Sequence, residues 1–269
     1  MGAVEPIPPL PPPGTSVGGP ITVSLPTFTV IGGIEAFPGG LVNSPPQIIS
    51  LPGALTISGG STLNSLANAD VAQGPGPGTV LVTGAGSTWS VADGHGDFSL
   101  WVGKEGPGVG TLTISDFGLV TEPQSMTDTF SGDTNVGYDP GAVGVLKVNS
   151  GGKLEGRGLL VGSQGTGTLT ISGGTVELQQ ITVIGRFPGG NGTINVNSGG
   201  TLTVGPILSY NFENGSNPNG PFVGGLIVGD GINGGGTGTL NINEGTVLVE
   251  NPDGTVVGKK CGRHRHRQR

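Results

Sequence analysis

The residues with the greatest potential for chemistry stand close together in the segment Asp93-Gly94-His95-Gly96-Asp97. Its two carboxylates and its imidazole are groups that can hold a divalent cation, and a histidine beside a carboxylate can act as a general acid or base. Zinc sites, however, usually have nitrogen or sulfur ligands held in place by a supporting shell of hydrogen bonds. We therefore interpret this segment as a solvated loop and expect no metal site there.

A second candidate for chemistry is the pair Glu155 and Glu177, which occupy equivalent positions in successive repeats of the chain. Enzymes that cleave polysaccharides place paired carboxylates, and in lyases also basic residues, along one groove. Before residue 259 the basic residues are few: Lys104, Lys147, Lys153, Arg157 and Arg186. We therefore predict a ladder of carboxylates on a surface, and a polysaccharide-active lyase or hydrolase stays as the alternative function.

Two glycine-rich segments, 189–194 and 235–240, are similar to the calcium-binding motif Gly-Gly-x-Gly-x-Asp. In that motif the Asp carboxylate binds the ion, but Ile194 and Leu240 stand at its place here. The sequence also has no Gly-x-Ser-x-Gly elbow, and no lysine follows a glycine-rich segment as in a nucleotide-binding loop. We expect no catalytic residue, no metal and no cofactor.

The elements that position these residues are predicted by a repeated phrase of the type Gly-Thr-Leu-Thr-Ile. Its copies begin at residues 53, 78, 110, 144, 167, 192 and 238, a base period near 23 to 25 residues with insertions. A second signature, an aliphatic residue followed by glycine, precedes the clearest copies at Val102-Gly103, Val161-Gly162, Ile184-Gly185 and Val228-Gly229. A period of this length is typical of one turn of a solenoid.

The unit at 167–191 shows three short strands in each period: Thr168–Ile171, Thr175–Leu178 and Ile181–Ile184. In the first of them Leu169 and Ile171 share one face, because side chains alternate along a strand. Equivalent aliphatic pairs recur in the other copies, so stacked coils would form apolar columns. We predict an all-β fold, a parallel β-helix of about seven or more coils.

Composition and charge narrow the function classes. Gly and Pro are abundant (57 and 22 of 269 residues), and charged residues make up only 11%. The net charge of −7 combines an acidic body with a basic end at 259–269, so we expect no nucleic acid partner for the body. Cys261 is the one cysteine, which excludes an internal disulfide. No apolar run is long enough to span a membrane.

The chain divides into a Pro-rich lead (1–20), an irregular N-terminal cap (21–52), the repeats (53–258) and a basic tail (259–269). Two insertions, Pro123–Asp133 and Ile207–Gly224, interrupt the rhythm. The second contains Tyr210, Phe212 and Glu213, which we predict as ligand-binding residues, because protruding loops of solenoids often carry function.

Threonines at equivalent strand positions suggest a further hypothesis, an ice-binding solenoid. They recur at Thr111/Thr113, Thr168/Thr170, Thr193/Asn195 and Thr239/Asn241, with Lys147 interrupting the column. Such columns can order water, but threonine is also a common outward residue of strands. We keep ice binding as a minor alternative.

The segment Leu81-Val82-Thr83-Gly84-Ala85-Gly86-Ser87-Thr88-Trp89-Ser90-Val91, followed by Leu100-Trp101-Val102-Gly103 and Gly108-Val109-Gly110-Thr111-Leu112-Thr113-Ile114-Ser115, resembles the repeat of autotransporter passengers and PEP-CTERM-associated surface proteins. Looser copies extend the resemblance over 53–258. It implies a right-handed β-helix displayed outside a Gram-negative cell and no catalytic residue. The export signal and the outer-membrane barrel or anchor are then expected outside this chain.

These observations together predict a noncatalytic, secreted or cell-surface β-helix. It would act as an adhesin-like passenger or stalk that displays binding loops to a host surface or a glycan.

Overall fold

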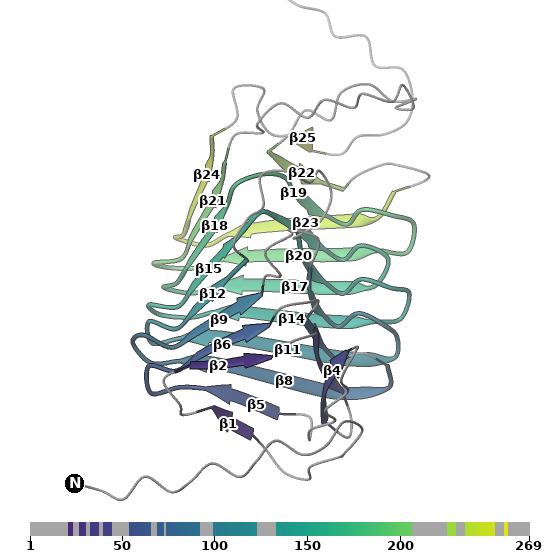
Figure 1. Ribbon diagram of the computed structural model, residues 1–269. Helices are drawn as coiled ribbons and strands as arrows, with labels where there is room; N and C mark the ends of the chain where they lie inside the picture. Colours follow the sequence, from purple (N-terminus) through teal and green to yellow (C-terminus); the bar gives the residue numbers. More distant parts are fainter. Residues whose placement is uncertain are drawn as a thin grey trace, which may run out of the picture.

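The computed structural model describes residues 54–65, 69–72, 74–91, 99–122, 133–205, 225–229 and 235–250, and the backbone of strands at 21–23, 27–30, 33–37, 40–44 and 256–257. These residues form three long sheets that the chain visits in turn, one strand per sheet in each coil (Figure 1). Every strand pair between successive coils is parallel. The predicted parallel β-helix is confirmed, and the described residues contain no helix long and apolar enough to cross a membrane.

The first sheet contains β1 (Ile21–Val23), β5 (Ala54–Ile57), β8 (Gly76–Thr83), β11 (Gly108–Ser115), β14 (Val143–Val148), β17 (Thr166–Ile171), β20 (Asn191–Val196) and β23 (Thr237–Ile242). The second sheet contains β2 (Thr27–Val30), β6 (Thr62–Ser65), β9 (Thr88–Val91), β12 (Leu119–Thr121), β15 (Lys153–Gly156), β18 (Thr175–Leu178), β21 (Thr201–Val204) and β24 (Thr246–Val249). The third sheet contains β3 (Gly33–Phe37), β4 (Gly40–Ser44), β7 (Ala69–Val71), β10 (Leu100–Val102), β13 (Asp133–Val136), β16 (Gly158–Val161), β19 (Thr182–Ile184), β22 (Leu226–Val228) and β25 (Val256–Val257).

The seven copies of the repeated phrase all lie in the first sheet and in the predicted register. Gly110, for example, stands opposite Gly78 of the preceding coil and Gly144 of the next. The aliphatic pair of the phrase is buried in the first six copies, as Leu169 and Ile171 are, whereas in the last copy Leu240 is partly buried and Ile242 is 52% exposed. Since each coil places the same pair over the one below, the interior is a stack of aliphatic side chains. The three strands predicted for 167–191 are β17, β18 and β19, with Ile181 just before the last of them.

Strands of the segment predicted as an irregular cap take part in the stack. β1, β2 and β3 pair in parallel with β5, β6 and β7, one strand in each sheet. β3 also pairs with β4 in an antiparallel hairpin at the edge of the third sheet. Strands β1, β2 and β3 therefore contribute the three sides of a coil of the β-helix below the first copy of the repeated phrase (Figure 1).

The aliphatic-glycine signature ends the strands of the third sheet. Gly137, after Val136, has a φ of 70°, and a Cβ there would collide with the carbonyl of Thr166 in the next coil. Only glycine combines that backbone conformation with so close an approach. Glycines with nearly the same φ follow four other third-sheet strands, at Gly103, Gly162, Gly185 and Gly229, whereas β7 is followed by Ala72 with a φ of 65°.

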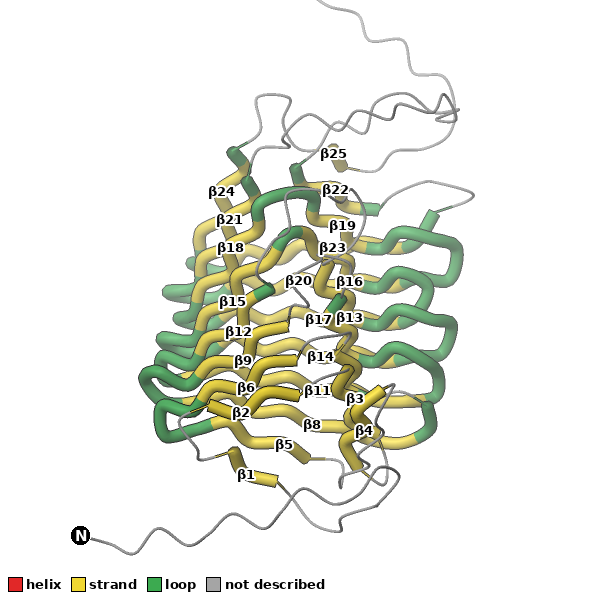
Figure 2. The backbone as a smooth tube through the Cα atoms, in the orientation of Figure 1, coloured by secondary structure: helices red, strands yellow, loops and turns green. Residues whose placement is uncertain are grey.

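Two of the three corners of the coil differ strongly in how much their length varies. Figure 2 shows the described corners as green loops stacked along the solenoid. The corner from the first to the second sheet is short in every coil: 58–61, 84–87, 116–118, 149–152, 172–174, 197–200 and 243–245. The corner from the second to the third sheet varies widely: 66–68, 92–99, 122–132, 157, 179–181, 205–225 and 250–255. Both predicted insertions lie at this corner. The first insertion was predicted to end at Asp133, which is instead the first residue of β13.

Candidate ligand-binding face

Several residues singled out in the sequence lie outside the part of the chain that the structure describes. They are the predicted ligand-binding residues Tyr210, Phe212 and Glu213, the segment 93–97 with its histidine, and the tail 259–269. The strand topology places the connections that contain 93–97 and 207–224 at one kind of corner, between the second and third sheets. The described residues nearest to that corner are therefore the candidates for a ligand-binding site.

Glu155 and Glu177 form the predicted ladder on the second sheet, as register partners on β15 and β18. Lys153 lies beside both, with its Nζ 2.6 Å from Glu155 Oε1 and 2.9 Å from Glu177 Oε2. All three side chains are substantially exposed, and the hydrogen bonds to the two carboxylates raise the pKa of Lys153. The position of Lys153 between the two carboxylates was not predicted from the sequence. This group is a solvated ion triad on a flat strand face.

The outer face of the third sheet differs from the other two faces because side chains that project away from the core are buried there. Its central column consists of Asp70, Trp101, Asn135, Leu160, Val183 and Ile227, one residue from each coil. Leu160, Val183 and Ile227 form an apolar cluster separate from the core. Asp70 and Asn135 are only 1% and 4% exposed, and Trp101 is partly exposed.

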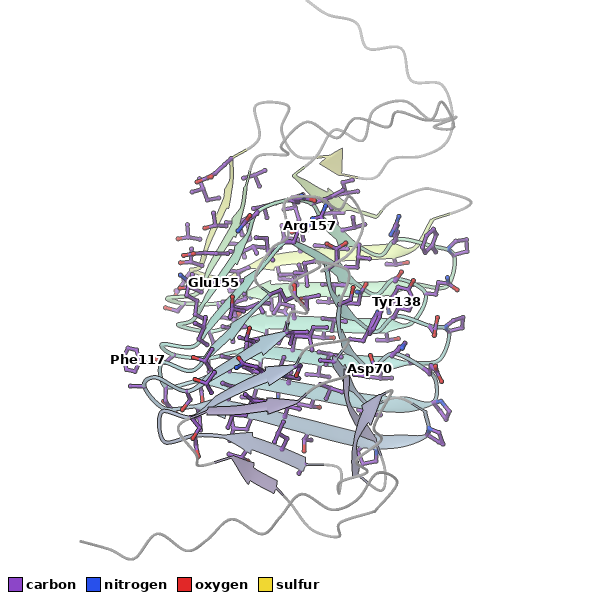
Figure 3. The ribbon with its side chains drawn as sticks, viewed as in Figure 1. Asp70, Phe117, Tyr138, Glu155 and Arg157 are labelled. Atoms are coloured by element: carbon purple, nitrogen blue, oxygen red, sulfur yellow. The ribbon has the colours of Figure 1, made fainter. Side chains whose placement is uncertain are left out.

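Two residues that follow turn glycines pack against Trp101. Lys104, after Gly103, places Nζ 4.2 Å from the centre of the indole ring and 3.1 Å from Asp70 Oδ2. Tyr138, after Gly137, meets Trp101 edge to face with 6.5 Å between ring centres. Figure 3 shows Asp70 and Tyr138 on the same side of the solenoid. We refer to Asp70, Trp101, Lys104, Asn135 and Tyr138 as the aromatic cluster.

In the aromatic cluster, Nε1 of Trp101 and Oδ1 of Asn135 are buried polar atoms without a hydrogen-bond partner in the described structure. These residues stand opposite each other on β10 and β13. The other amide atom of Asn135, Nδ2, donates to the backbone oxygen of Asp133 at 2.8 Å, and this bond holds the amide in one orientation. A buried donor and a buried acceptor are thus left unsatisfied on neighbouring strands.

Two further carboxylates lie where the chain passes from the second to the third sheet. Glu122 occupies an interior position and accepts a hydrogen bond from Thr134 Oγ1 at 2.9 Å. Its Oε2 lies 3.0 Å from the place that a Cβ would take on Gly156 of the next coil. Burial raises the pKa of Glu122 well above its usual value, while the bond from Thr134 opposes that rise and the charge of Asp133 adds to it.

Asp133 lies on the outer face of β13, which it shares with Asn135, because the two residues are two positions apart and side chains alternate along a strand. Thr134, between them, faces the interior. Its carboxylate lies against Gly158, where a Cβ would collide with it. Burial raises the pKa of Asp133, and Arg157 and Arg186 lower it in turn. Glu122 therefore faces the interior and Asp133 the exterior, so the two carboxylates do not share a groove.

The predicted polar columns on the first sheet are formed in register. Thr113, Lys147 and Thr170 stand in one column, so the lysine interrupts the threonines as expected. In the upper coils the column continues with Asn195 and Asn241, whose side chains are joined by a hydrogen bond of 2.9 Å. A hydrophobic residue, Val145, interrupts the neighbouring column.

Within the described ranges no group of three or more His, Cys, Asp or Glu residues is arranged to hold a metal ion. No protein-family model matches this chain, and neither a curated protein nor a solved structure matches it.

The aromatic cluster was missed because its members are far apart in the sequence. A signal for it is present, since Trp101 precedes the aliphatic-glycine signature at a place where the later coils have Leu160, Val183 and Ile227.

Proposed function

We propose that this protein is a noncatalytic, extracellular or cell-surface β-helix that acts as an adhesin-like passenger or stalk. The observation that supports this function best is the segregation of variable connections to one corner of an otherwise regular coil. A constant solenoid with variable segments along one edge is suited to binding, because a rigid scaffold holds the segments that recognise a partner.

The positions of the longer connections along the stack support a shared surface. Connections 92–99 and 122–132 belong to two successive coils. Connection 205–225 belongs to the coil that lies three coils beyond the one with 122–132. With about 4.8 Å between stacked strands, their points of departure span roughly 20 Å along the axis. A span of this size would suit a partner larger than a single small molecule, such as a glycan chain or a protein surface.

The charge of the body favours the same class of partners. Before residue 259 the chain has five Lys and Arg against 18 Asp and Glu. Polyanions such as nucleic acids and acidic membranes are repelled by such a body. We therefore infer a neutral or weakly charged partner, of which a glycan on a host or neighbouring cell is the best candidate.

The proposal is tested by replacing residues 207–223 with a short Gly-Ser linker in the full chain and, separately, residues 124–131. Binding of wild type and variants to a glycan array and to intact cells is compared, and circular dichroism verifies the β fold. We expect at least one replacement to abolish binding. A matched control places the same linker in the corner 197–200, which should leave binding intact.

Two outcomes would contradict the proposal. One is undiminished binding by a folded variant that carries both replacements. The other is release of shortened or unsaturated oligosaccharides from polysaccharides, since a noncatalytic protein cannot produce them.

A further inference from the structure

We propose that the aromatic cluster on the third sheet is a saccharide-binding subsite, in which one sugar hydroxyl bridges Trp101 Nε1 and Asn135 Oδ1. This inference rests on the proposed function and names the place and the chemistry of the contact. It adds binding residues on the strands beside that corner to those that the sequence suggested in the variable segments.

The two unsatisfied atoms define the chemistry of the missing group. A buried polar atom without a partner destabilises the folded state, so two of them side by side require an explanation. Trp101 Nε1 can only donate and Asn135 Oδ1 can only accept. A group that satisfies both must accept and donate at once. Hydroxyls do so, whereas carboxylates only accept and ammonium groups only donate.

The amide of Asn135 is held in the orientation that such a ligand needs. Its Nδ2 is occupied by the backbone oxygen of Asp133, so Oδ1 is directed away from that bond. The opposing strands β10 and β13 bring the acceptor close to the indole, because paired strands are about 4.8 Å apart. Trp101 and Asn135 therefore form a fixed donor–acceptor pair.

The surroundings of the pair have the composition of a sugar site. The partly exposed indole of Trp101 and the ring of Tyr138 offer apolar faces and edges to the C–H groups of a pyranose. Asp70 and Lys104 add a carboxylate and an ammonium group that are already paired at 3.1 Å. Because that pair is neutral as a whole, the subsite favours an uncharged sugar over an acidic one.

The test uses the full chain labelled with nitrogen-15, in which the two tryptophans give two indole N–H signals. Trp89 is an internal reference, since it is fully buried and its Nε1 donates to Ser65 Oγ at 2.9 Å. Titration with neutral oligosaccharides based on glucose, N-acetylglucosamine, xylose and galactose should shift the Trp101 signal with at least one of them. The Trp89 signal should stay in place.

Two variants test the subsite by replacing residues of the central column on the third sheet. Asn135→Leu and Trp101→Leu introduce the residue that the column already has at Leu160, so the fold should tolerate them. Each should weaken binding of the responding sugar about tenfold or more, since each removes a buried hydrogen bond of the ligand. Leu160→Val, in the same column but outside the cluster, should bind as the wild type does.

The outcomes separate this inference from the proposed function. Failure of every sugar to move the Trp101 signal, or equal affinity of Asn135→Leu and wild type, would overturn the subsite and indicate an ordered water between the two atoms. If replacing 207–223 abolishes cell or glycan binding while Asn135→Leu has no effect, the proposed function stands and the subsite falls. If Trp101 responds but binding to cells and the glycan array survives both segment replacements, the variable segments are not the display surface and the subsite stands.

Discussion

Glu122 and Thr134 are joined inside the solenoid, where Thr134 Oγ1 donates to Glu122 Oε1 at 2.9 Å. They replace aliphatic residues at two interior positions. Glu122, the residue after β12, continues the register to the level of Val91 and Leu178, and Thr134 lies between Leu100 and Leu159. Gly156 in the next coil leaves room for the carboxyl group. The core of this coil therefore contains a carboxyl group in a column that is otherwise largely aliphatic.

The buried carboxyl group makes stability depend on pH. Because burial raises the pKa of Glu122 above its unfolded value, the folded state binds the proton more tightly. Its contribution is fully present below the unfolded pKa of about 4.3 and is lost as pH rises toward the folded pKa. Glu122→Gln keeps the acceptor for Thr134 and cannot ionise. We expect the free energy of unfolding to fall less steeply above pH 4 in the variant than in wild type.

The measurement is urea unfolding of both proteins from pH 4 to pH 8. Asp133 and Asp139 also have raised pKa values, so the difference between the two curves, rather than either curve alone, reports Glu122. Parallel curves would show that Glu122 does not titrate differently in the folded state.

Gly137→Ala is expected to destabilise the protein by about 3 kcal/mol. Part of this loss, about 1–2 kcal/mol, comes from the left-handed backbone at a φ of 70°. The rest comes from the collision of the new methyl group with the Thr166 carbonyl. Gly141→Ala is the matched control, because its φ is 79° but its new methyl group would meet only the Cα of Gly106, at 3.8 Å. Thermal and urea unfolding should show the smaller loss for Gly141→Ala, and equal losses would refute the close-packing argument.

Phe117→Gly is expected to stabilise the fold by about 1 kcal/mol. Phe117 is 71% exposed and has a φ of 66° in a corner where other coils place glycines, so the change removes backbone strain and little packing. Phe117→Ala, which keeps the strain, should leave stability nearly unchanged. The midpoint of thermal unfolding distinguishes the two, and a gain with alanine as large as with glycine would contradict the explanation. Figure 3 shows this ring projecting from the solenoid.

Lys153→Ala should lower stability by about 0.5–1 kcal/mol at low salt, since it leaves Glu155 and Glu177 directly opposite each other with no cation between them. The loss should shrink in the Glu177→Gln background and at 1 M salt, where exposed charges are screened. Urea unfolding of the four proteins forms a double-mutant cycle. A coupling between Lys153 and Glu177 that does not change with salt would argue against an electrostatic origin.

Much of the scaffold could be predicted from short stretches of sequence. The alternation of Thr168, Leu169, Thr170 and Ile171 shows a strand and its inward face, because side-chain direction in a strand depends only on parity. The signature at Ile184-Gly185 marks a turn because glycine tolerates the left-handed backbone that occurs there. Both signals are local, so they are visible without a structure, and the repeated phrase then determines which residues stack.

The candidate site could not be predicted in the same way, because its residues meet across coils of unequal length. Trp101 and Asn135 are register partners although the longest connection between them, 122–132, breaks the period. Glu122 stands just before the predicted insertion Pro123–Asp133, and only packing shows that it continues an interior column. The sequence by itself determined the strands, the turns and the repeating core, which depend on neighbouring residues. Only the tertiary structure decided that the variable connections share one corner and that Asp70, Trp101 and Asn135 stand together, because stacking brings together residues that the chain keeps apart.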